Sequence, residues 1–401
     1  MTAIEATLLV VDDNEDNRYT LTRRLNREGY KNLMVAKNGR EALDKLKTQA
    51  FDLVLLDIMM PDMNGYEVLE QVKATPALRD IPIIMISSLD EIESVIRCIE
   101  LGAEDYLNKP FDPTLLRARV GASLEKKRLR DEVRRNMERL VQELEAARAL
   151  QLAMLPRQFP TCSPSHPIAV HAVMESAREV GGDLYDCFYA GEHTFCFLVG
   201  DVCGKGASAA MFMARARSLV RITVSLWREW RTDDIDPGAL LEAVNRELCQ
   251  DNDDRMFITM FLGLIDTRSG LVSFVNAGHP RPHLISSTGE TKQIGAKPAL
   301  PLGVRRQARF QTLTLQILPG DALFVCTDGV FEAVNGEGEL FSIERMGQLL
   351  RQANAAEPRE MVRIVKDAVD AFAGNASRTD DLTALALRWR PAETAAERSM
   401  V

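Results

Sequence analysis

The stretch LVLLDIMMPDMNGYE, residues 53–67, places an apolar run directly before an aspartate, Asp57. An uninterrupted apolar run of this length is typical of a strand that is buried on both faces of a parallel sheet. Three similar runs lie in the same part of the chain, at Thr7–Val11, Ile81–Ile86 and Ala103–Leu107. Amphipathic stretches separate these runs, and strand–helix alternation predicts an α/β domain with a doubly wound sheet.

The chain is much longer than this segment, and its composition narrows the classes of protein that it can be. Its 401 residues are too many for one typical core, so we expect two or three domains. A net charge of −9 argues against a nucleic-acid binder. No apolar run approaches the roughly 20 residues that span a bilayer. The first residues lack the basic and apolar regions of a signal peptide, and the seven cysteines form no CxxC pair, so we expect a cytoplasmic protein.

Polar side chains follow the strands that we expect in the first segment. They are Asp12 and Asp13, Asp57, Ser87 and Ser88, and Lys109. Because the carboxyl ends of parallel strands meet at one edge of a sheet, we expect these groups to converge. Clustered carboxylates repel one another, and a divalent cation relieves that repulsion. A carboxylate beside Mg²⁺ can act as a nucleophile toward a phosphoryl donor, while a hydroxyl and an ammonium hold the product.

Residues 5–122 resemble the CheY-like receiver domain of response regulators. The motifs that carry the resemblance are VVDDNEDNR (10–18), LVLLDIMMPDMNGYE (53–67), PIIMISS (82–88) and Lys109-Pro110-Phe111. The resemblance implies that Asp57 is the phosphoacceptor and that a sensor histidine kinase is the partner. It implies a Mg²⁺ site formed by Asp12, Asp13, Asp57 and the main-chain carbonyl of Met59. It also implies three switch residues, namely the hydroxyl of Ser87, where threonine is commoner, the aromatic Tyr106 and the phosphate-binding Lys109.

Residues 123–156 form a proline-free connector until Pro156, and their apolar positions repeat in steps of four and three. The members of this stripe are 133, 137, 140, 144, 147, 151 and 154, of which Gln151 is the polar one. Such a heptad seam predicts a long helix that pairs with a second copy as a parallel coiled coil. A single helix packed on its own domain is the alternative reading. A homodimer joined through this helix could pass a change of geometry from one domain to the next.

Four short acidic motifs follow the connector. They are GGDLYD (181–186), GDVCGKG (200–206), TDG (327–329) and DDLT (380–383). Each lies next to an apolar run that reads as a strand, and longer helical segments such as Ala207–Trp227 and Pro358–Phe372 lie between the runs. Clustered strands with a few longer helices predict an α+β sandwich of two antiparallel sheets covered by helices. Carboxylates gathered at strand ends suit two divalent cations that activate a water for attack on phosphorus.

This second segment resembles the metal-dependent protein phosphatases of the PPM family, in their SpoIIE/RsbU branch. The motifs behind the resemblance are EVGGDLYD, VGDVCGKG, NAGHP (276–280), CTDGVFEA (326–333), RTDDLTAL (378–385) and the preceding ALQLAMLP. It implies hydrolysis of serine or threonine phosphoproteins with two ions of Mn²⁺ or Mg²⁺. The implied metal ligands are Asp183, Asp201, Asp328, Asp380, the adjacent Asp381 and the main-chain carbonyl of Val202. The resemblance also implies that four of these aspartates are the catalytic residues: Asp183, Asp201, Asp328 and Asp380.

These inferences predict a multidomain response regulator. We expect a receiver domain over 1–122, a coiled-coil linker helix over 123–156, a PPM-type phosphatase domain over 157–390 and a tail over 391–401. Phosphorylation of Asp57 would control the phosphatase, and the family branch suggests a phosphorylated anti-sigma-factor antagonist of the STAS type as substrate. The alternative is a catalytically silent adaptor that sequesters a regulatory protein. We expect no contact with nucleic acid or membrane, and no helix-turn-helix motif follows the receiver.

Overall fold

The computed structural model of the chain describes residues 5–88, 92–178, 180–230, 235–295, 299–374, 376 and 378–391. The chain forms two compact units, Met1–Val141 and Gln142–Val401. The boundary between them falls inside the segment predicted as a linker. Of the predicted tail 391–401, all but Pro391 lies outside the described residues.

The first unit is built on one parallel sheet with the strand order β2-β1-β3-β4-β5. The strands are β1 (Thr7–Val11), β2 (Asn32–Ala36), β3 (Leu53–Asp57), β4 (Ile83–Ser87) and β5 (Asp105–Asn108). The helices between them are α1 (Glu15–Arg27), α2 (Gly39–Thr48), α3 (Gly65–Ala74) and α4 (Ile92–Glu100). This order reverses direction beside β1, so the predicted doubly wound α/β fold is confirmed.

Each strand contributes to two cores, one on each face of the sheet. Leu9 and Val54 pack in one core, and Leu8 and Leu53 pack in the other. All five residues of β3 and of β4 are buried, which explains why their sequences are continuously apolar. Strand β2 has only one buried residue, because it lies at the sheet's edge. Its sequence therefore lacks the apolar run by which the other strands can be recognised.

Close backbone packing fixes the end of β3. A Cβ atom added to Gly65 would lie 2.2 Å from the main-chain oxygen of Asp57, so only glycine fits at this position. The preceding residue, Asn64, caps helix α3 in a reciprocal capping box with Glu67. The MNGYE part of the opening motif thus holds α3 against the strand that carries Asp57.

Helix α5 (Pro113–Met154) runs for 42 residues from the first unit into the second. The Asp112 carboxylate accepts hydrogen bonds from the main-chain N–H groups of Thr114 and Leu115, which satisfies two donors at the start of the helix. The predicted long helix is therefore present. Apolar members of the predicted seam are open to solvent within the chain: Val133 is 63%, Met137 58% and Leu140 54% exposed.

The second unit contains two antiparallel five-stranded sheets. One has the order β13-β10-β9-β8-β7, from β7 (Leu184–Tyr189), β8 (Thr194–Val202), β9 (Ile258–Asp266), β10 (Leu271–Ala277) and β13 (Leu313–Gln316). The other has the order β12-β11-β14-β15-β6, from β6 (Ile168–Glu175), β11 (His283–Ile285), β12 (Thr291–Gln293), β14 (Ala322–Cys326) and β15 (Leu382–Trp389). The helices are α6 (Ala207–Trp230), α7 (Pro237–Leu248), α8 (Ile343–Gln352) and α9 (Pro358–Ala373), with a 3₁₀ turn at Asp328–Val330.

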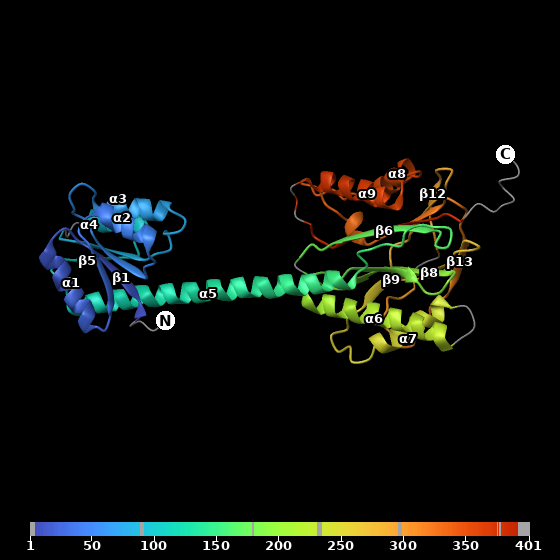
Figure 1. Cartoon of the computed structure of the whole chain (residues 1–401), viewed down its shortest axis with the longest axis horizontal. Helices are drawn as coiled ribbons and strands as arrows, with labels where there is room; N and C mark the ends of the chain where they lie inside the picture. Colours follow the sequence, from blue (N-terminus) through green and yellow to red (C-terminus); the bar gives the residue numbers. More distant parts are fainter. Residues whose placement is uncertain are drawn as a thin grey trace. The chain divides into compact units, whose positions relative to one another are not determined.

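These elements form four layers. Helices α6 and α7 contact β8, β9 and β10 of the first sheet, and α8 and α9 contact β11, β15 and β6 of the second. Figure 1 shows α6 and α7 on the side of β8 and β9, and α8 and α9 on the side of β6. Phe197 and Phe261 of one sheet share a core with Val325 and Leu385 of the other. The predicted α+β sandwich is confirmed. Strands β11 and β12 are too short, at three residues each, to be recognised from the sequence, and the buried Asp186 interrupts the apolar pattern of β7.

The helices that the structure describes are each too short or too polar to cross a bilayer.

Candidate metal centres

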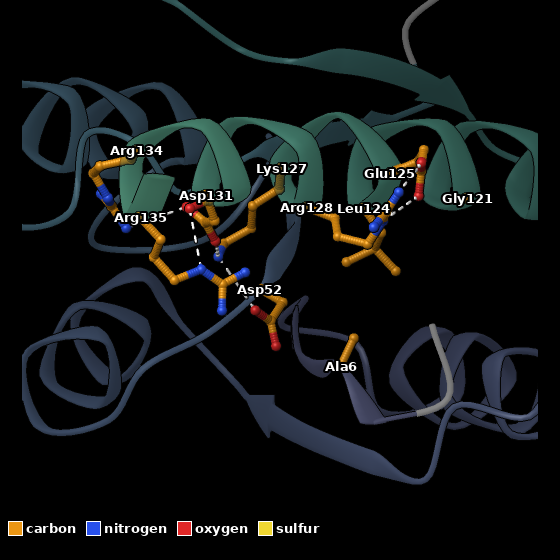
Figure 2. A pocket seen from close by; sticks show the side chains of 10 residues that line it. All are labelled: Ala6, Asp52, Gly121, Leu124, Glu125, Lys127, Arg128, Asp131, Arg134 and Arg135. Atoms are coloured by element: carbon orange, nitrogen blue, oxygen red, sulfur yellow. Dashed lines mark hydrogen bonds and ion pairs between the residues drawn. The ribbon is translucent and has the colours of Figure 1, made fainter. Parts of the chain in front are cut away.

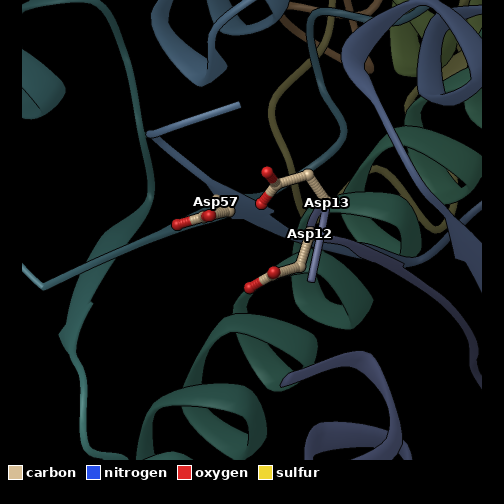
Figure 3. A group of neighbouring side chains, drawn as sticks. All are labelled: Asp12, Asp13 and Asp57. Atoms are coloured by element: carbon tan, nitrogen blue, oxygen red, sulfur yellow. The ribbon is translucent and has the colours of Figure 1, made fainter. Parts of the chain in front are cut away.

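The first acidic cluster lies at the carboxyl ends of β1 and β3. Asp12, Asp13 and Asp57 each offer an oxygen, and these oxygens lie within 4.8 Å of one another (Figure 3). Asp12 and Asp57 are buried, whereas Asp13 is exposed. The three acids that the sequence predicted to converge are therefore together, and all-oxygen ligands of this kind suit Mg²⁺.

Lys109, which follows β5, supplies a positive charge inside this cluster. Its Nζ lies 2.8 Å from Oδ2 of Asp12 and 2.9 Å from Oδ1 of Asp57. Burial raises the pKa of Asp57 to about 6; the hydrogen bond with Lys109 opposes this shift, and the charge of Asp12 adds to it. Burial tends to lower the pKa of Lys109, but its bonds to Asp12 and Asp57 outweigh burial and raise that pKa. One ammonium thus faces three carboxylates, which leaves a net negative site that fits a divalent cation.

The remaining predicted receiver residues lie on neighbouring elements. Ser87 is fully buried at the end of β4, next to β3, where Asp57 pairs with Ile86. The main-chain oxygen of Ser87 accepts a 2.7 Å hydrogen bond from the N–H of Lys109. Tyr106 lies in β5 and is 8% exposed, and Met59 follows β3. The roles of Ser87, Tyr106 and the Met59 carbonyl stay predictions.

A separate cavity of about 270 Å³ lies between α5 and the opposite end of the receiver strands (Figure 2). Asp52 lines it and precedes β3, whereas Asp57 ends that strand. Its charged groups pair with one another, since Lys127 contacts both Asp52 at 3.3 Å and Asp131 at 2.5 Å. The cavity therefore lies away from the phosphoacceptor candidate.

The second acidic cluster gathers the four motifs of the second unit. Asp183 precedes β7, Asp201 lies near the end of β8, Asp328 follows β14, and Asp380 and Asp381 precede β15. Strands β7 and β8 belong to one sheet, and β14 and β15 to the other. The two sheets thus bring carboxylates from distant parts of the chain to a shared end of the sandwich. Within the described residues, no three of these acids bring one oxygen each within 4.8 Å of one another.

Crowding of negative charge marks this cluster. Burial, and then the charge of Asp201, raise the pKa of Asp183, which is 1% exposed. Burial, followed by the charges of Asp328 and Asp380, raises the pKa of Asp201 to about 7. Burial, followed by Asp380, also raises the pKa of Asp328. Oxygen donors crowded in this way fit divalent cations, because cations would relieve the repulsion that raises the pKa values.

The two adjacent aspartates of the DDLT motif have different environments. The Asp381 carboxylate is nearly buried and accepts 2.8 Å hydrogen bonds from the N–H groups of Ala177 and Gly182. The Asp380 side chain is 48% exposed, and its Oδ1 lies 3.1 Å from Nζ of Lys205. Lys205 also donates to the main-chain oxygen of Thr379. This geometry favours Asp380 as the metal ligand and Asp381 as the group that fixes the loop before Asp183.

Three glycines of the motifs are required by close approach around Asp381 and Val202. An added Cβ would lie 2.0 Å from Oδ2 of Asp381 at Gly181 and 1.9 Å from its main-chain oxygen at Gly329. At Gly182 it would lie 2.7 Å from the main-chain oxygen of Val202, the predicted carbonyl ligand. These contacts give a physical reason for the GGD and TDG patterns, and they hold Val202 beside the residue that precedes Asp183.

The end of helix α5 reaches the same loop. Gln151 is buried, its Nε2 donates to the main-chain oxygen of Gly181 at 2.6 Å, and its Oε1 accepts from the N–H of Gly181 at 3.2 Å. Sequence reasoning placed Gln151 in the heptad seam as its polar member and missed this contact. The signal available was a polar residue at a seam position inside the ALQLAMLP motif. The linker helix is thus bonded two residues from Asp183.

The NAGHP segment forms a locked turn next to the acids. The Asn276 side chain donates to the oxygen of His279 at 2.9 Å and accepts from the N–H of His279 at 2.8 Å. Nδ1 of His279 lies 3.1 Å from Oγ1 of Thr259, which pairs with Asp201 in the sheet. Burial lowers the pKa of His279 to about 3, so its ring is neutral at physiological pH. These contacts fit a structural role for the turn.

Comparisons with known proteins agree with this architecture. Residues 8–121 match the family model described as the response regulator receiver domain, and residues 191–390 match the one described as stage II sporulation protein E (SpoIIE). Protein IcfG of Synechocystis is 31% identical over 277 residues, which are 64% of this chain and 42% of that protein. The alkaline phosphatase synthesis transcriptional regulatory protein PhoP of Bacillus subtilis is 41% identical over 117 residues, 29% of this chain and 48% of that protein. The chain spans less than half the length of these curated relatives.

One solved structure supports the fold of the second unit. The PP2C domain of SiaA from Pseudomonas aeruginosa superposes with a TM-score of 0.55 at 20% identity, covering 63% of this chain and 98% of that domain. At this identity the likeness shows the fold alone.

The sheets and the family models define a receiver domain and a second domain with the PP2C fold. More particularly, residues 8–121 match the response regulator receiver family and residues 191–390 match the SpoIIE family.

Proposed function

We propose that this protein is a metal-dependent phosphatase of serine or threonine phosphoproteins, and that phosphorylation of Asp57 controls it. The observation that carries the proposal is the convergence of Asp183, Asp201, Asp328 and Asp380 at one end of the sandwich, with raised pKa values at the first three. Carboxylates whose pKa values are raised by burial and by neighbouring charges occur chiefly at functional sites.

Asp183, Asp201, Asp328, Asp380 and the carbonyl of Val202 are the groups that would hold two ions of Mn²⁺ or Mg²⁺. Such ions supply Lewis acidity toward a phosphoryl group and lower the pKa of a bound water. The chain's own residues fix the geometry. The hydroxyl of Thr327 donates to Oδ2 of Asp183 at 2.8 Å, and Asp381 anchors the loop before Asp183 through two main-chain N–H groups.

Lys205 completes the cluster on its exposed side. Its ammonium pairs with Asp380 and also tends to lower the pKa of Asp328 through its charge. The lysine thus offsets part of the negative charge that an incoming phosphoprotein would meet. No side-chain nucleophile is needed, because the proposed attack on phosphorus is by water.

In the receiver, a Mg²⁺ ion held by Asp12, Asp13, Asp57 and the carbonyl of Met59 would neutralise charge during phosphoryl transfer from a sensor histidine kinase to Asp57. Lys109 already contacts Asp57, so its ammonium is placed to hold the new phosphate. The buried hydroxyl of Ser87 and the ring of Tyr106 are the proposed residues that respond to the phosphate.

Helix α5 supports a route between the two sites. It begins directly after the receiver's β5 region, and its Gln151 is bonded to Gly181 beside Asp183. A change in the pairing or position of this helix would move the loop that carries a metal ligand. We propose that the exposed stripe of Val133, Met137 and Leu140 pairs with a second copy as a coiled coil in a homodimer.

The proposed substrate is a phosphorylated anti-sigma-factor antagonist of the STAS type, a proposal that the match of residues 191–390 to the SpoIIE family model supports. The competing proposal is an adaptor that binds a regulatory protein without turnover. The presence of all the predicted acids favours the enzyme.

Hydrolysis of p-nitrophenyl phosphate with Mn²⁺, by the wild type and by Asp201→Ala, tests the enzymatic proposal. We expect turnover that requires the metal and disappears in Asp201→Ala. Absence of turnover in the wild type, with this probe and with a phosphorylated STAS protein, would favour the adaptor.

A further inference from the structure

A cavity of about 440 Å³ adjoins the proposed catalytic acids. Asp201, Asp328 and Glu332 line part of it. Phe331, Ile343 and Met346 give it an apolar side. The volume is much larger than a phosphoryl group needs, so the cavity has room for neighbouring atoms of a substrate as well.

Arg281 also lines this cavity and follows the locked NAGHP turn. Because Asn276 and His279 bond each other twice, the backbone that carries Arg281 is held in place. The side chain itself is exposed, and it makes no hydrogen bond or ion pair with the residues that the structure describes. Of the described residues that line the cavity, Arg281 alone carries a permanent positive charge.

Lys205 is a second cation close to the acids, and it is already engaged. Lys205 pairs with Asp380 and donates to the main-chain oxygen of Thr379. Arg281, in contrast, forms no ion pair with Asp201, Asp328 or Glu332, although these carboxylates line the same cavity. A guanidinium that stays unpaired beside several carboxylates is available to a ligand, and its planar fork suits phosphoryl or carboxylate oxygens.

We propose that this cavity receives the phosphorylated segment of a protein substrate, and that Arg281 binds an oxyanion of that segment. The oxyanion is either the phosphoryl group or the carboxylate of an acidic residue beside it. This inference rests on the proposed phosphatase function and names the residue that selects the substrate. The apolar side formed by Phe331, Ile343 and Met346 then contacts the flanking side chains.

Three probes separate the two oxyanions. They are p-nitrophenyl phosphate, a phosphoserine peptide with alanine on both sides, and the same peptide with glutamate on both sides. We would compare kcat/KM for the wild type, Arg281→Gln, Arg281→Lys and the control Arg309→Gln. Arg309 is an exposed arginine that pairs with Glu242 and does not line the cavity. Calorimetric titration with Mn²⁺ would accompany each variant, because damage to the fold or the acids would change metal affinity.

We expect Arg281→Gln to lower kcat/KM by roughly ten- to a hundredfold, the loss typical of one charge-assisted hydrogen bond. Arg281→Lys should recover part of it, and Arg309→Gln should match the wild type. A loss on all three probes assigns Arg281 to the phosphoryl group, and a loss confined to the glutamate peptide assigns it to the neighbouring carboxylate. Unchanged kcat/KM on every probe, with Mn²⁺ affinity intact, overturns the proposal.

Failure of the underlying function has a different signature. If the wild type hydrolyses none of the probes, the phosphatase proposal fails, and fluorescence anisotropy of the labelled peptides then tests the cavity directly. Weaker binding of the phosphorylated peptides to Arg281→Gln than to the wild type supports the inference without catalysis. Equal binding by both proteins contradicts it.

Discussion

The two acidic clusters of this chain use similar residues in different arrangements. In the receiver, oxygens of Asp12, Asp13 and Asp57 lie within 4.8 Å of one another, and Lys109 contacts two of these acids from inside the cluster. In the phosphatase domain the acids come from both sheets and are more widely spread, and Lys205 pairs only with Asp380 at the exposed side.

The difference fits the two chemistries that we propose. A compact site with an internal ammonium suits a single cation and leaves one carboxylate, that of Asp57, to act as the nucleophile. A wider set of carboxylates suits a pair of cations about 3.5–4 Å apart, which activates water rather than a side chain. In this proposal, the internal ammonium distinguishes a site that keeps a phosphate from one that releases it.

The largest expected effect is the loss of phosphatase activity in Asp201→Ala. Its carboxylate lies among the other acids, so its removal should lower kcat by roughly 10²–10³-fold or more, the cost of deleting one group that stabilises transition-state charge. Steady-state assays with Mn²⁺ measure this. The control Asp12→Ala, in the receiver, should keep the basal activity. A comparable loss in this control would contradict the assignment of catalysis to the second cluster alone.

The second prediction concerns pH and the receiver. Burial raises the pKa of Asp57 from 3.8 to about 6 in the folded state, so its neutral form is favoured by folding. The resulting stability is present below pH 4 and is lost as the pH rises through 6. In metal-free buffer, Asp57→Asn should therefore gain stability relative to the wild type between these pH values, by at most about 3 kcal/mol.

Calorimetric unfolding of the full-length wild type and Asp57→Asn, each at pH 4, 5, 6 and 7, checks this prediction. The difference should grow with pH and shrink when Mg²⁺ is added to the wild type. A difference that stays constant across the series would show that Asp57 does not titrate as its burial implies.

The third prediction separates the adjacent aspartates. Asp381→Asn replaces one of the two carboxylate oxygens that accept main-chain N–H groups by an amide NH2, so it should lower the free energy of unfolding by about 1–3 kcal/mol. Asp380→Asn should leave stability nearly unchanged and weaken Mn²⁺ binding. Denaturant titration measures the stability of both variants, and calorimetry measures their affinity for Mn²⁺. Loss of Mn²⁺ affinity in Asp381→Asn, with loss of stability in Asp380→Asn, would contradict the assignment of Asp380 as the ligand.

The smallest expected effect is on the coupling between the receiver and the phosphatase activity. Gln151→Ala removes both hydrogen bonds to Gly181, and we expect the response of activity to beryllofluoride, an aspartyl-phosphate mimic, to fall by roughly three- to tenfold. Gln142→Ala is the matched control, because Gln142 is exposed on the same helix. Equal responses in the two variants would remove Gln151 from the route between the domains.

Much of this architecture was predictable from the sequence. The buried strands β1, β3 and β4 are apolar throughout, and the acids that follow β1 and β3 converge as expected because parallel strands end at one edge. The sandwich was also predictable, since β8, β9 and β15 are long and buried.

Other features depend on contacts that the local sequence does not encode. The edge strand β2 and the short strands β11 and β12 have too few buried residues to produce a pattern. Asp380 and Asp381 cannot be told apart in the sequence. The structure distinguishes them because Asp381 accepts hydrogen bonds from main-chain N–H groups 199 and 204 residues earlier in the chain. The same holds for Gln151, whose partner Gly181 lies 30 residues further along the chain.

The most direct test of the central claim is the rate of Mn²⁺-dependent p-nitrophenyl phosphate hydrolysis with and without beryllofluoride, in the wild type and in Asp57→Ala. We predict that beryllofluoride changes the rate of the wild type and leaves the rate of Asp57→Ala unaltered. Identical rates in the wild type with and without beryllofluoride, under conditions where the receiver binds it, would contradict control of the phosphatase by Asp57.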